Sequence, residues 1–391
     1  MKIFILLSRV PFPLDKGDKL RAYNFIKHLS VNNDIYLCCL NDTKLQPESI
    51  FELQKYCKRI VVYKINYLSI AINLIKALFN GKPFQIGYFY NTKVKRSILN
   101  LIDDISPDHI LCQLIRTSDY VKDVNINKTL DYQDILSYGI KRRIDRSPFY
   151  MQMVLKMEYT RLLNYEHNIF DSFTNKLIIS EPDKLLIPHF NNNSIHVLKN
   201  GLDHEYYKPI KAEKEFDLLF SGNMAYPPNV DAVVHLINKI IPLVKKEYPN
   251  IRVLIAGANP TQKVRSLASK NVVITGWVDD MRECYAKSKI FIAPMRIGTG
   301  LQNKLLEAMA MKLPCITTPL ANDSLGALDG VEILVGKKID ELSQHICNLM
   351  KDISLTTKLS ENGCAFVYNK FNWEREIQKL EEIIHNNNSA L

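Results

Sequence analysis

The chain has 391 residues, of which 47% are hydrophobic and 24% charged, and its net charge is +10. This length suits two or three domains, and the composition excludes a disordered chain, collagen and a coiled coil. The N-terminal apolar run ends at Leu7 and no apolar run reaches 18 residues. We therefore expect neither a signal peptide nor a transmembrane helix.

Short apolar runs alternate with amphipathic stretches along the whole sequence. In chain order, strands are expected at 2–8, 34–40, 59–65, 109–114, 128–132, 176–180 and 195–200, then at 216–222, 251–257, 271–276, 289–294, 314–318 and 331–335. Helices are expected at 19–29, 230–247, 301–311 and 371–387. This alternation predicts βαβ units, and hence an α/β protein with two doubly wound parallel sheets. We place the domain boundary in the polar segment 201–215.

Cysteine and histidine spacing gives no sign of a metal. The eight cysteines contain no C-x-x-C pair and lie mostly in apolar runs, which indicates buried thiols in a reducing compartment. The nine histidines have no ligand spacing, and no nucleic-acid-binding pattern is present. We expect no metal, no cofactor and no nucleic-acid partner.

The segment 290–319 predicts an anion site. An apolar strand ends at Pro294, a turn containing Gly298, Thr299 and Gly300 follows, and a helix begins directly after it. Free backbone N–H groups and the helix dipole favour an anion at such a turn, and glycine lets a phosphate approach the backbone. The cations Arg296 and Lys304 flank the turn, which suits a diphosphate.

Glu307 lies three residues after Lys304 on the same expected helix. A carboxylate beside a phosphate site is unfavourable unless it binds another group, and the diol of a ribose is a suitable one because it offers two hydroxyl donors. The alternative is an ordinary Glu–Lys pair on a helix surface.

These segments resemble the GT-B-fold glycosyltransferases, specifically the large family-4 group of retaining sugar-nucleotide enzymes. The similarity extends over 11–30, 197–209, 220–260, 274–294, 290–319 and 371–374. The nearest subgroup is that of the sugar transferases associated with exopolysaccharide and PEP-CTERM (exosortase) loci.

The resemblance implies two Rossmann-like domains that face each other across a cleft. Residues 1–205, together with a returning C-terminal helix at 371–391, would form the acceptor-side domain, and 206–370 would bind the nucleotide sugar. The implied activity is retaining transfer of a hexose-type sugar from a nucleoside diphosphate to a glycan or lipid-linked acceptor in surface polysaccharide synthesis. No protein nucleophile is expected for this reaction.

The resemblance also assigns residues to the donor. Glu307 would bind the ribose and Lys304 the diphosphate, and Gly17 would approach the diphosphate from the first domain. The remaining donor-binding positions are Gly222, Asn223, Trp277, Val278, Gly298, Thr299 and Gly300, with Trp277 and Val278 near the base.

Two departures from the family pattern concern the diphosphate. Thr299 stands where the family has the first of two paired glutamates, so this position can donate a hydrogen bond but cannot act as a charged acceptor. The segment 221–230 also lacks the cations that many members carry there. Arg296 and Lys304 would then have to neutralise the leaving group.

Asp131 and Asp134 are the candidates for the acceptor side. They follow the strand expected at 128–132, and the carboxyl end of that strand would face the cleft. We expect one or both to bind the acceptor or to handle its proton. The alternative is that Asp134 caps a helix.

The stretch 67–84 is apolar, and residues 51–100 around it carry nine Lys and Arg against one Glu. Two interpretations stand: a core helix of the first domain, or a helix that lies on an anionic membrane surface through the segment 58–96. We expect a cytoplasmic protein, with peripheral attachment to the inner face of the plasma membrane under the second interpretation.

Two other classes of function share this fold. One is a nucleotide-sugar epimerase, which needs no acceptor. The other is a non-catalytic partner subunit, which Thr299 and the missing cations would suit.

Overall fold

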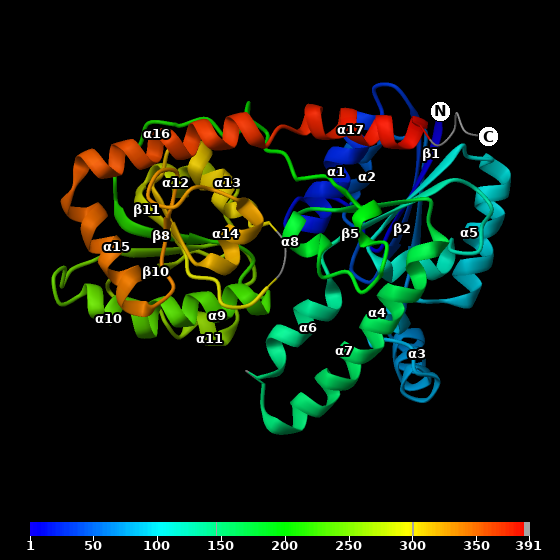
Figure 1. The fold of residues 1–391 in the computed structure, drawn as a ribbon, viewed down its shortest axis with the longest axis horizontal. Coiled ribbons are helices and arrows are strands. Elements are labelled where there is room, and N and C mark those ends of the chain that lie inside the picture. The colour runs from blue at the N-terminus through cyan, green and yellow to red at the C-terminus, as the bar shows by residue number, and fades with distance from the viewer. Residues whose placement is uncertain (146, 299–300, 387–391) are drawn as a thin grey trace. The chain divides into compact units, whose positions relative to one another are not determined.

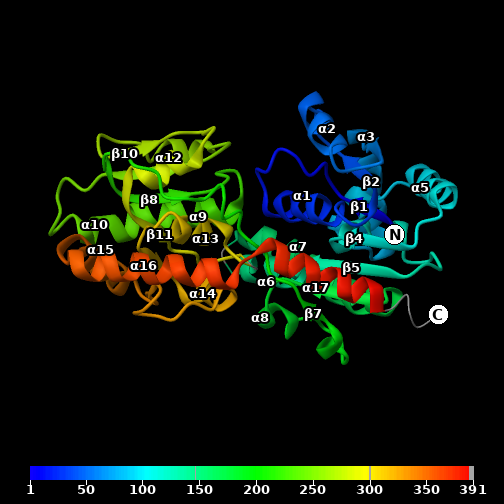
Figure 2. The same ribbon diagram turned by 90° about the horizontal axis from the view of Figure 1, so that it is seen from above.

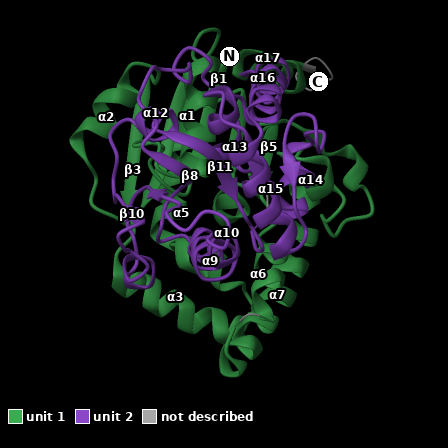
Figure 3. Cartoon of the chain, turned by 90° about the vertical axis from the view of Figure 1, so that its left-hand side faces the viewer, with its two compact units in different colours: residues 1–199, 373–391 green, residues 200–372 purple. Residues whose placement is uncertain are grey.

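The computed structural model of the chain describes residues 1–145, 147–298 and 301–386. It divides into two units, Met1–Lys199 with Trp373–Leu391 (unit 1) and Asn200–Asn372 (unit 2), coloured separately in Figure 3. The chain thus passes between units at 199/200 and 372/373, where the sequence had suggested 205/206 and 370/371.

Unit 1 contains a seven-stranded parallel sheet in the order β3-β2-β1-β4-β5-β6-β7, and Figure 2 looks across β2, β1, β4, β5 and β7 in that order. The strands are β1 (Lys2–Leu7), β2 (Asp34–Asn41), β3 (Arg59–Lys64), β4 (His109–Gln113), β5 (Lys128–Gln133), β6 (Asn175–Ile178) and β7 (His196–Val197).

Helices lie between these strands. They are α1 (Gly17–Leu29), α2 (Pro47–Gln54), α3 (Tyr67–Asn80), α4 (Phe84–Phe89), α5 (Thr92–Ile105), α6 (Leu136–Ile144), α7 (Phe149–Ile169), α8 (Glu181–Lys184) and α17 (Trp373–Asn386). Short 3-10 turns occupy Ile115–Tyr120, Phe170–Ser172 and Asn192–Ser194.

The alternation of side chains along β1 builds two cores in unit 1. Phe4 and Leu6 enter a cluster with α5, whereas Ile3, Ile5 and Leu7 enter a second cluster with α1 and α17. Both faces of β1 are therefore buried, which explains its continuous apolar sequence. The C-terminal helix α17 contributes its regularly spaced apolar residues to the second cluster, namely Trp373, Ile377, Leu380 and Ile384.

Unit 2 contains a six-stranded parallel sheet in the order β10-β9-β8-β11-β12-β13. The strands are β8 (Phe216–Ser221), β9 (Val253–Ala256), β10 (Val272–Ile274), β11 (Ser288–Ala293), β12 (Cys315–Thr317) and β13 (Leu334–Val335). The helices are α9 (Pro227–His235), α10 (Ile241–Val244), α11 (Gln262–Arg265), α12 (Met281–Ala286), α13 (Asn303–Ala310), α14 (Pro319–Leu325), α15 (Ile339–Lys351) and α16 (Ile353–Lys370).

Helices cover both faces of this sheet; Figure 1 shows α9 and α10 on one side and α16 on the other. The single helix predicted at 230–247 is instead α9, a π-turn at Leu236–Ile240 and α10. Pro242 lies in the first turn of α10, and a proline has no N–H to continue the α-helical bonding.

The predicted fold class, two doubly wound parallel α/β domains, is confirmed. Among the described residues, no helix combines the length and the apolarity that crossing a bilayer requires.

Candidate functional site

The candidate donor site lies at the carboxyl edge of the unit 2 sheet. The strand order reverses between β8 and β11, because β9 and β10 lie on one side of β8 while β12 and β13 lie beyond β11. Parallel α/β sheets bind ligands at the carboxyl ends of the strands at such a switch point. Gly222 directly follows β8, and the loop with Arg296 and Gly298 follows β11.

Two glycines allow the loops at this edge to pack closely. Gly257 has φ 137°, and a Cβ at that position would lie 2.0 Å from the carbonyl oxygen of Gly222. Gly222 has φ 147°, and its Cβ would lie 2.7 Å from Asn229 Nδ2 and 3.2 Å from Lys304 Nζ. Only glycine therefore fits either position, because the space that a Cβ would take at Gly222 is filled by Asn229 and Lys304.

Lys304 is held beside Gly222 by neutral groups. It lies in the first turn of α13, its Nζ donates a hydrogen bond to Asn229 Oδ1, and it sits 4.7 Å from the centroid of the Phe220 ring. Among the described residues no carboxylate forms an ion pair with it. Burial lowers the pKa of Lys304 to about 7, with Glu307 opposing the shift. A bound anion would stabilise the charged form of this amine.

Glu307 is oriented by two tyrosines. The Tyr285 hydroxyl donates to Glu307 Oε2 at 2.7 Å, and Tyr207 also hydrogen-bonds to the carboxylate. Burial raises the pKa of Glu307, and these bonds oppose the shift. A carboxylate has about four acceptor positions, so two tyrosines leave room for a ribose hydroxyl. The ribose role of Glu307 stays a prediction.

Arg296 was expected to be available to a diphosphate, but its guanidinium is bonded to a carboxylate. Its Nε and Nη2 donate to the two oxygens of Asp231 on α9 at 3.0 and 2.6 Å. This bidentate pair already neutralises the guanidinium. The sequence analysis named neither Asp231 nor Asn229, because they lie 65 and 75 positions away from their partners Arg296 and Lys304.

The remaining donor-site predictions lie at the same edge of the sheet. Asn223 anchors its own turn, because its Oδ1 accepts from the Ala225 N–H at 3.0 Å and its carbonyl accepts from Asn229 at 2.9 Å. Trp277 is 59% exposed, although its indole N–H donates to Asp279, and Val278 is half-buried. Gly298 has φ 116°. Thr299 and Gly300 lie outside the described residues.

In unit 1, Asp131 forms a buried ion pair with Arg21, and this corrects the expectation that it faces a cleft. Arg21 donates to both of its oxygens, from Nε at 2.7 Å and from Nη2 at 3.1 Å. Both side chains are fully buried, and Arg21 also bonds to the Leu198 carbonyl. Every residue of β5 is buried, so neither face of this strand presents Asp131 to solvent.

Asp134 lies at the carboxyl end of β5, and its role toward the acceptor stays a prediction. It follows β5, is half-buried and makes no side-chain hydrogen bond within the described part of the chain. It does not cap α6, whose N-cap residue is Ile135. Burial, reinforced by the charges of Asp183 and Asp18, raises the pKa of Asp134 to about 8. An unpaired carboxyl group with this pKa can accept or donate a proton near neutral pH.

Gly17 begins α1 at the switch point of the unit 1 sheet, between β1 and β4. It is exposed, and the preceding N-cap residue Lys16 makes no side-chain capping bond. The nearby charges are paired, Arg9 with Asp18 at 2.8 Å and Lys19 with Asp15 at 2.7 Å. The first turn of α1 is thus a charged, accessible helix start.

The comparisons with known proteins concern unit 2 most directly. Residues 215–352 match the family model described as "Glycosyl transferases group 1". Unit 2 is a glycosyltransferase group 1 domain. The predicted enzyme class, glycosyltransferase, is thereby confirmed. Within the described residues, no group of three His, Cys, Asp or Glu side chains could hold a metal ion.

Similarity to individual proteins covers nearly all of the chain, including unit 1. A curated relative, the "Uncharacterized 44.6 kDa protein in cps region" of Klebsiella pneumoniae, is 24% identical and covers 97% of this chain and 98% of its own.

Solved glycosyltransferase-fold structures also match both units. Sucrose-phosphate synthase from Thermosynechococcus elongatus matches with a TM-score of 0.74 and 12% identity over 100% of both chains. Anabaena HepE, solved in complex with UDP and glucose, matches with a TM-score of 0.69 and 14% identity over 98% of this chain and 99% of its own. These likenesses confirm the GT-B fold.

Proposed function

We propose that this glycosyltransferase is a retaining enzyme that transfers a hexose-type sugar from a nucleoside diphosphate to a glycan or lipid-linked acceptor in surface polysaccharide synthesis. The observation that carries the proposal is the amine of Lys304, which Asn229 holds beside Gly222 in a group 1 domain and whose pKa is lowered by burial. The UDP and glucose bound to HepE support a nucleotide-sugar donor, and the cps-region relative supports polysaccharide synthesis.

The proposed chemistry breaks the anomeric C–O bond, so negative charge develops on the departing diphosphate. Lys304 would stabilise that charge, and in a dry site one such donor contributes about 2.7–4 kcal/mol to lowering the barrier. Glu307 would hold the ribose and fix the position of the diphosphate against Gly222.

On the acceptor side, Asp134 is the group we propose to take the hydroxyl proton. Its raised pKa, about 8, places it near the working pH of a general base. Asp131 is left out of this role because Arg21 occupies both of its oxygens.

The first experiment is a thermal-shift measurement with UDP, GDP and NAD, followed by transfer assays with a panel of nucleotide sugars. We expect UDP or GDP to raise the melting temperature and NAD to leave it unchanged. Stabilisation by NAD alone would overturn the proposed donor class. Proton NMR of the product tests retention of the anomeric configuration.

A non-catalytic partner subunit is the second candidate, and the Arg296–Asp231 pair favours it because that pair removes one of the two expected diphosphate cations. Unchanged glycan output with both Lys304→Ala and Glu307→Ala would establish this alternative. Incubation with donor alone tests for an epimerase, since only an epimerase would convert the donor without an acceptor. We further propose a cytoplasmic location and a relationship to the exopolysaccharide and PEP-CTERM-associated transferases.

A further inference from the structure

Unit 1 carries two exposed apolar segments. Of the 26 large apolar side chains that are exposed in the described residues, eleven lie on α3 or in the first turns of α7. We name the α3 face lobe A and the start of α7 lobe B. Lobe A consists of Tyr67, Leu68, Ile72, Ile75, Leu78 and Phe79, and lobe B of Phe149, Tyr150, Met151, Met153 and Val154.

Lobe A is one side of a helix that is apolar on both sides. Ile70 and Ala77 pack inward and are the only buried residues of α3. Leu68, Ile72, Ile75 and Phe79 recur at helical spacing along the outer side and are 72%, 44%, 57% and 87% exposed. The helix α3 therefore packs on the core through its inner side and leaves its outer side apolar and exposed.

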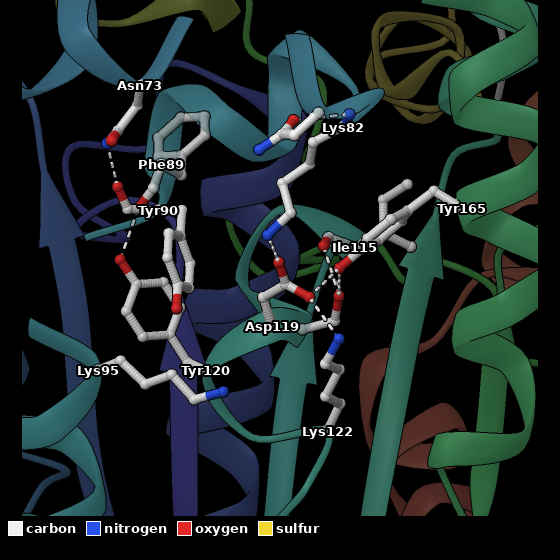
Figure 4. Close-up of polar contacts among 12 residues, drawn as sticks. Asn73, Lys82, Phe89, Tyr90, Lys95, Ile115, Asp119, Tyr120, Lys122 and Tyr165 are labelled. Carbon is white, nitrogen blue, oxygen red and sulfur yellow. Dashed lines mark hydrogen bonds and ion pairs between the residues drawn. The ribbon is translucent and has the colours of Figure 1, made fainter. Parts of the chain in front are cut away.

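The base of α3 is firmly anchored, so its outer side is a fixed surface. Figure 4 shows Lys82, just after α3, paired with Asp119, which also binds Lys122 at 3.2 Å and the Tyr165 hydroxyl at 2.9 Å. In the same view, Asn73 donates to the Tyr90 carbonyl. None of these contacts uses a side chain of lobe A.

The helix α7 links the two lobes. Its Arg161 donates to the Ala77 carbonyl at 2.8 Å and to the Leu78 carbonyl at 3.0 Å, at the C-terminal end of α3. Its Glu158 accepts from the backbone N–H groups of Phe84 and Gln85, which begin α4. In Figures 1 and 3, α3 and the start of α7 both extend toward the bottom of unit 1.

The charges around the lobes are almost all positive. Residues 67–82 contain two lysines and no acid, and residues 136–157 contain five Lys and Arg against one Asp. Lys76 and Lys156 are exposed and, among the described residues, form no ion pair. An isologous contact between two copies of this chain would bring such cations together, whereas an anionic lipid surface would neutralise them.

The wider segment 58–96 contributes less charge than its composition suggests. Lys58 pairs with Asp34, Arg59 with Asp104, and Lys95 with Asp123. Positive charge that could contact lipid therefore has to come from Lys76 and Lys156 beside the lobes and from α6.

We propose that unit 1 docks on an anionic phospholipid surface by inserting lobes A and B together. Aromatic and aliphatic side chains would enter the boundary between headgroups and acyl chains, and the lysines beside them would contact lipid phosphates. This proposal rests on the proposed function in one respect, because docking would bring unit 1 to a lipid-linked acceptor. Lipid binding is measured without donor or acceptor, so a failure to bind lipid can be told apart from a failure of the proposed transferase activity.

The test is flotation of the full chain with vesicles of phosphatidylcholine, with and without phosphatidylglycerol. We expect the protein to bind the anionic vesicles and added salt to weaken this binding. Either double variant, Leu68→Ser/Phe79→Ser or Phe149→Ser/Met153→Ser, should lower the apparent partition coefficient at least tenfold, which is on the order expected for removing two inserted side chains.

The matched control is Phe190→Ser/Ile353→Ser, because these side chains are equally exposed, at 88% and 80%, but lie outside both lobes. It should bind as the unmodified protein does. The proposal would be overturned if the protein did not bind the vesicles or if all variants bound them equally. It would also be overturned if the protein formed a dimer in solution that the lobe substitutions dissociate. Unchanged circular dichroism and melting temperatures of the variants exclude misfolding as the cause of a loss.

Discussion

The pKa of Lys304, about 7, predicts how donor affinity depends on pH. Because burial lowers this pKa, the free enzyme loses the charge on Lys304 as the pH rises through 7. A bound diphosphate favours the charged amine, so binding above pH 7 requires proton uptake. The protonated fraction of Lys304 in the free protein falls from about one quarter at pH 7.5 to about one hundredth at pH 9. UDP should therefore bind roughly 20-fold more weakly at pH 9, which corresponds to a loss of about 1.8 kcal/mol in binding free energy.

Isothermal titration of UDP between pH 7 and 9 measures this dependence. Lys304→Met should bind weakly with no such slope. The matched control is Lys214→Met, because burial also lowers the pKa of Lys214 but its Nζ bonds to the carbonyl of Ser288, the first residue of β11, at the opposite edge of the sheet. An unmodified protein whose UDP affinity is the same at pH 7.5 and 9 would refute the reasoning, as would a Lys304→Met variant that keeps the slope.

Four further substitutions test the rest of the two candidate sites. Gly222→Ala should lower the free energy of unfolding by about 1–3 kcal/mol and weaken UDP binding, because the new Cβ meets Asn229 at 2.7 Å. The control Gly326→Ala has open space at its Cβ and should leave UDP binding intact. Equal UDP binding by both variants would contradict this. Asp131→Asn should lower the free energy of unfolding by about 3–5 kcal/mol in urea titrations, since it leaves the buried Arg21 unpaired, and a change under 1 kcal/mol would refute the structural role. Asp134→Asn should abolish transfer while UDP affinity stays unchanged. With saturating donor, which keeps Lys304 charged, transfer by the unmodified protein should rise about tenfold per pH unit well below pH 8 and level off above it. A variant that retains activity removes Asp134 from the mechanism. Asn229→Asp should raise the pKa of Lys304 and remove the pH dependence of UDP binding, while weakening that binding at pH 7.5; tighter binding would contradict the argument.

Periodicity and strand length were sufficient to predict the fold. The apolar runs of β1 and β8 and the alternating helices indicate parallel sheets without further information, because strands buried on both faces must be continuously apolar. The helix predicted at 230–247 is instead three elements between Pro227 and Val244, and Pro242 interrupts its hydrogen bonding. Each of these signals is local in the sequence.

The candidate site depends on contacts between residues that are distant in the sequence, and these contacts were not predicted. The pairing of Asp131 with Arg21 joins residues 110 positions apart, and the bond between Lys304 and Asn229 joins residues 75 positions apart. No spacing rule predicts such contacts. The composition of 51–100 overstates its free charge for the same reason, because the acids Asp34, Asp104 and Asp123, which pair with three of its cations, lie outside the segment.

The two cations of the predicted diphosphate site show how neighbours decide a role. Arg296 is held by a carboxylate, so it enters any binding reaction already neutralised and would have to leave Asp231 to contact a phosphate. Lys304 is held by an amide oxygen and an aromatic ring, which orient the amine but do not neutralise it. Burial of this amine, which the charge of Glu307 only partly offsets, disfavours its charged form in the free protein, and an anionic ligand would favour that form on binding. Asn rather than Asp at position 229 is therefore the reason why we propose that the diphosphate contacts Lys304 and not Arg296.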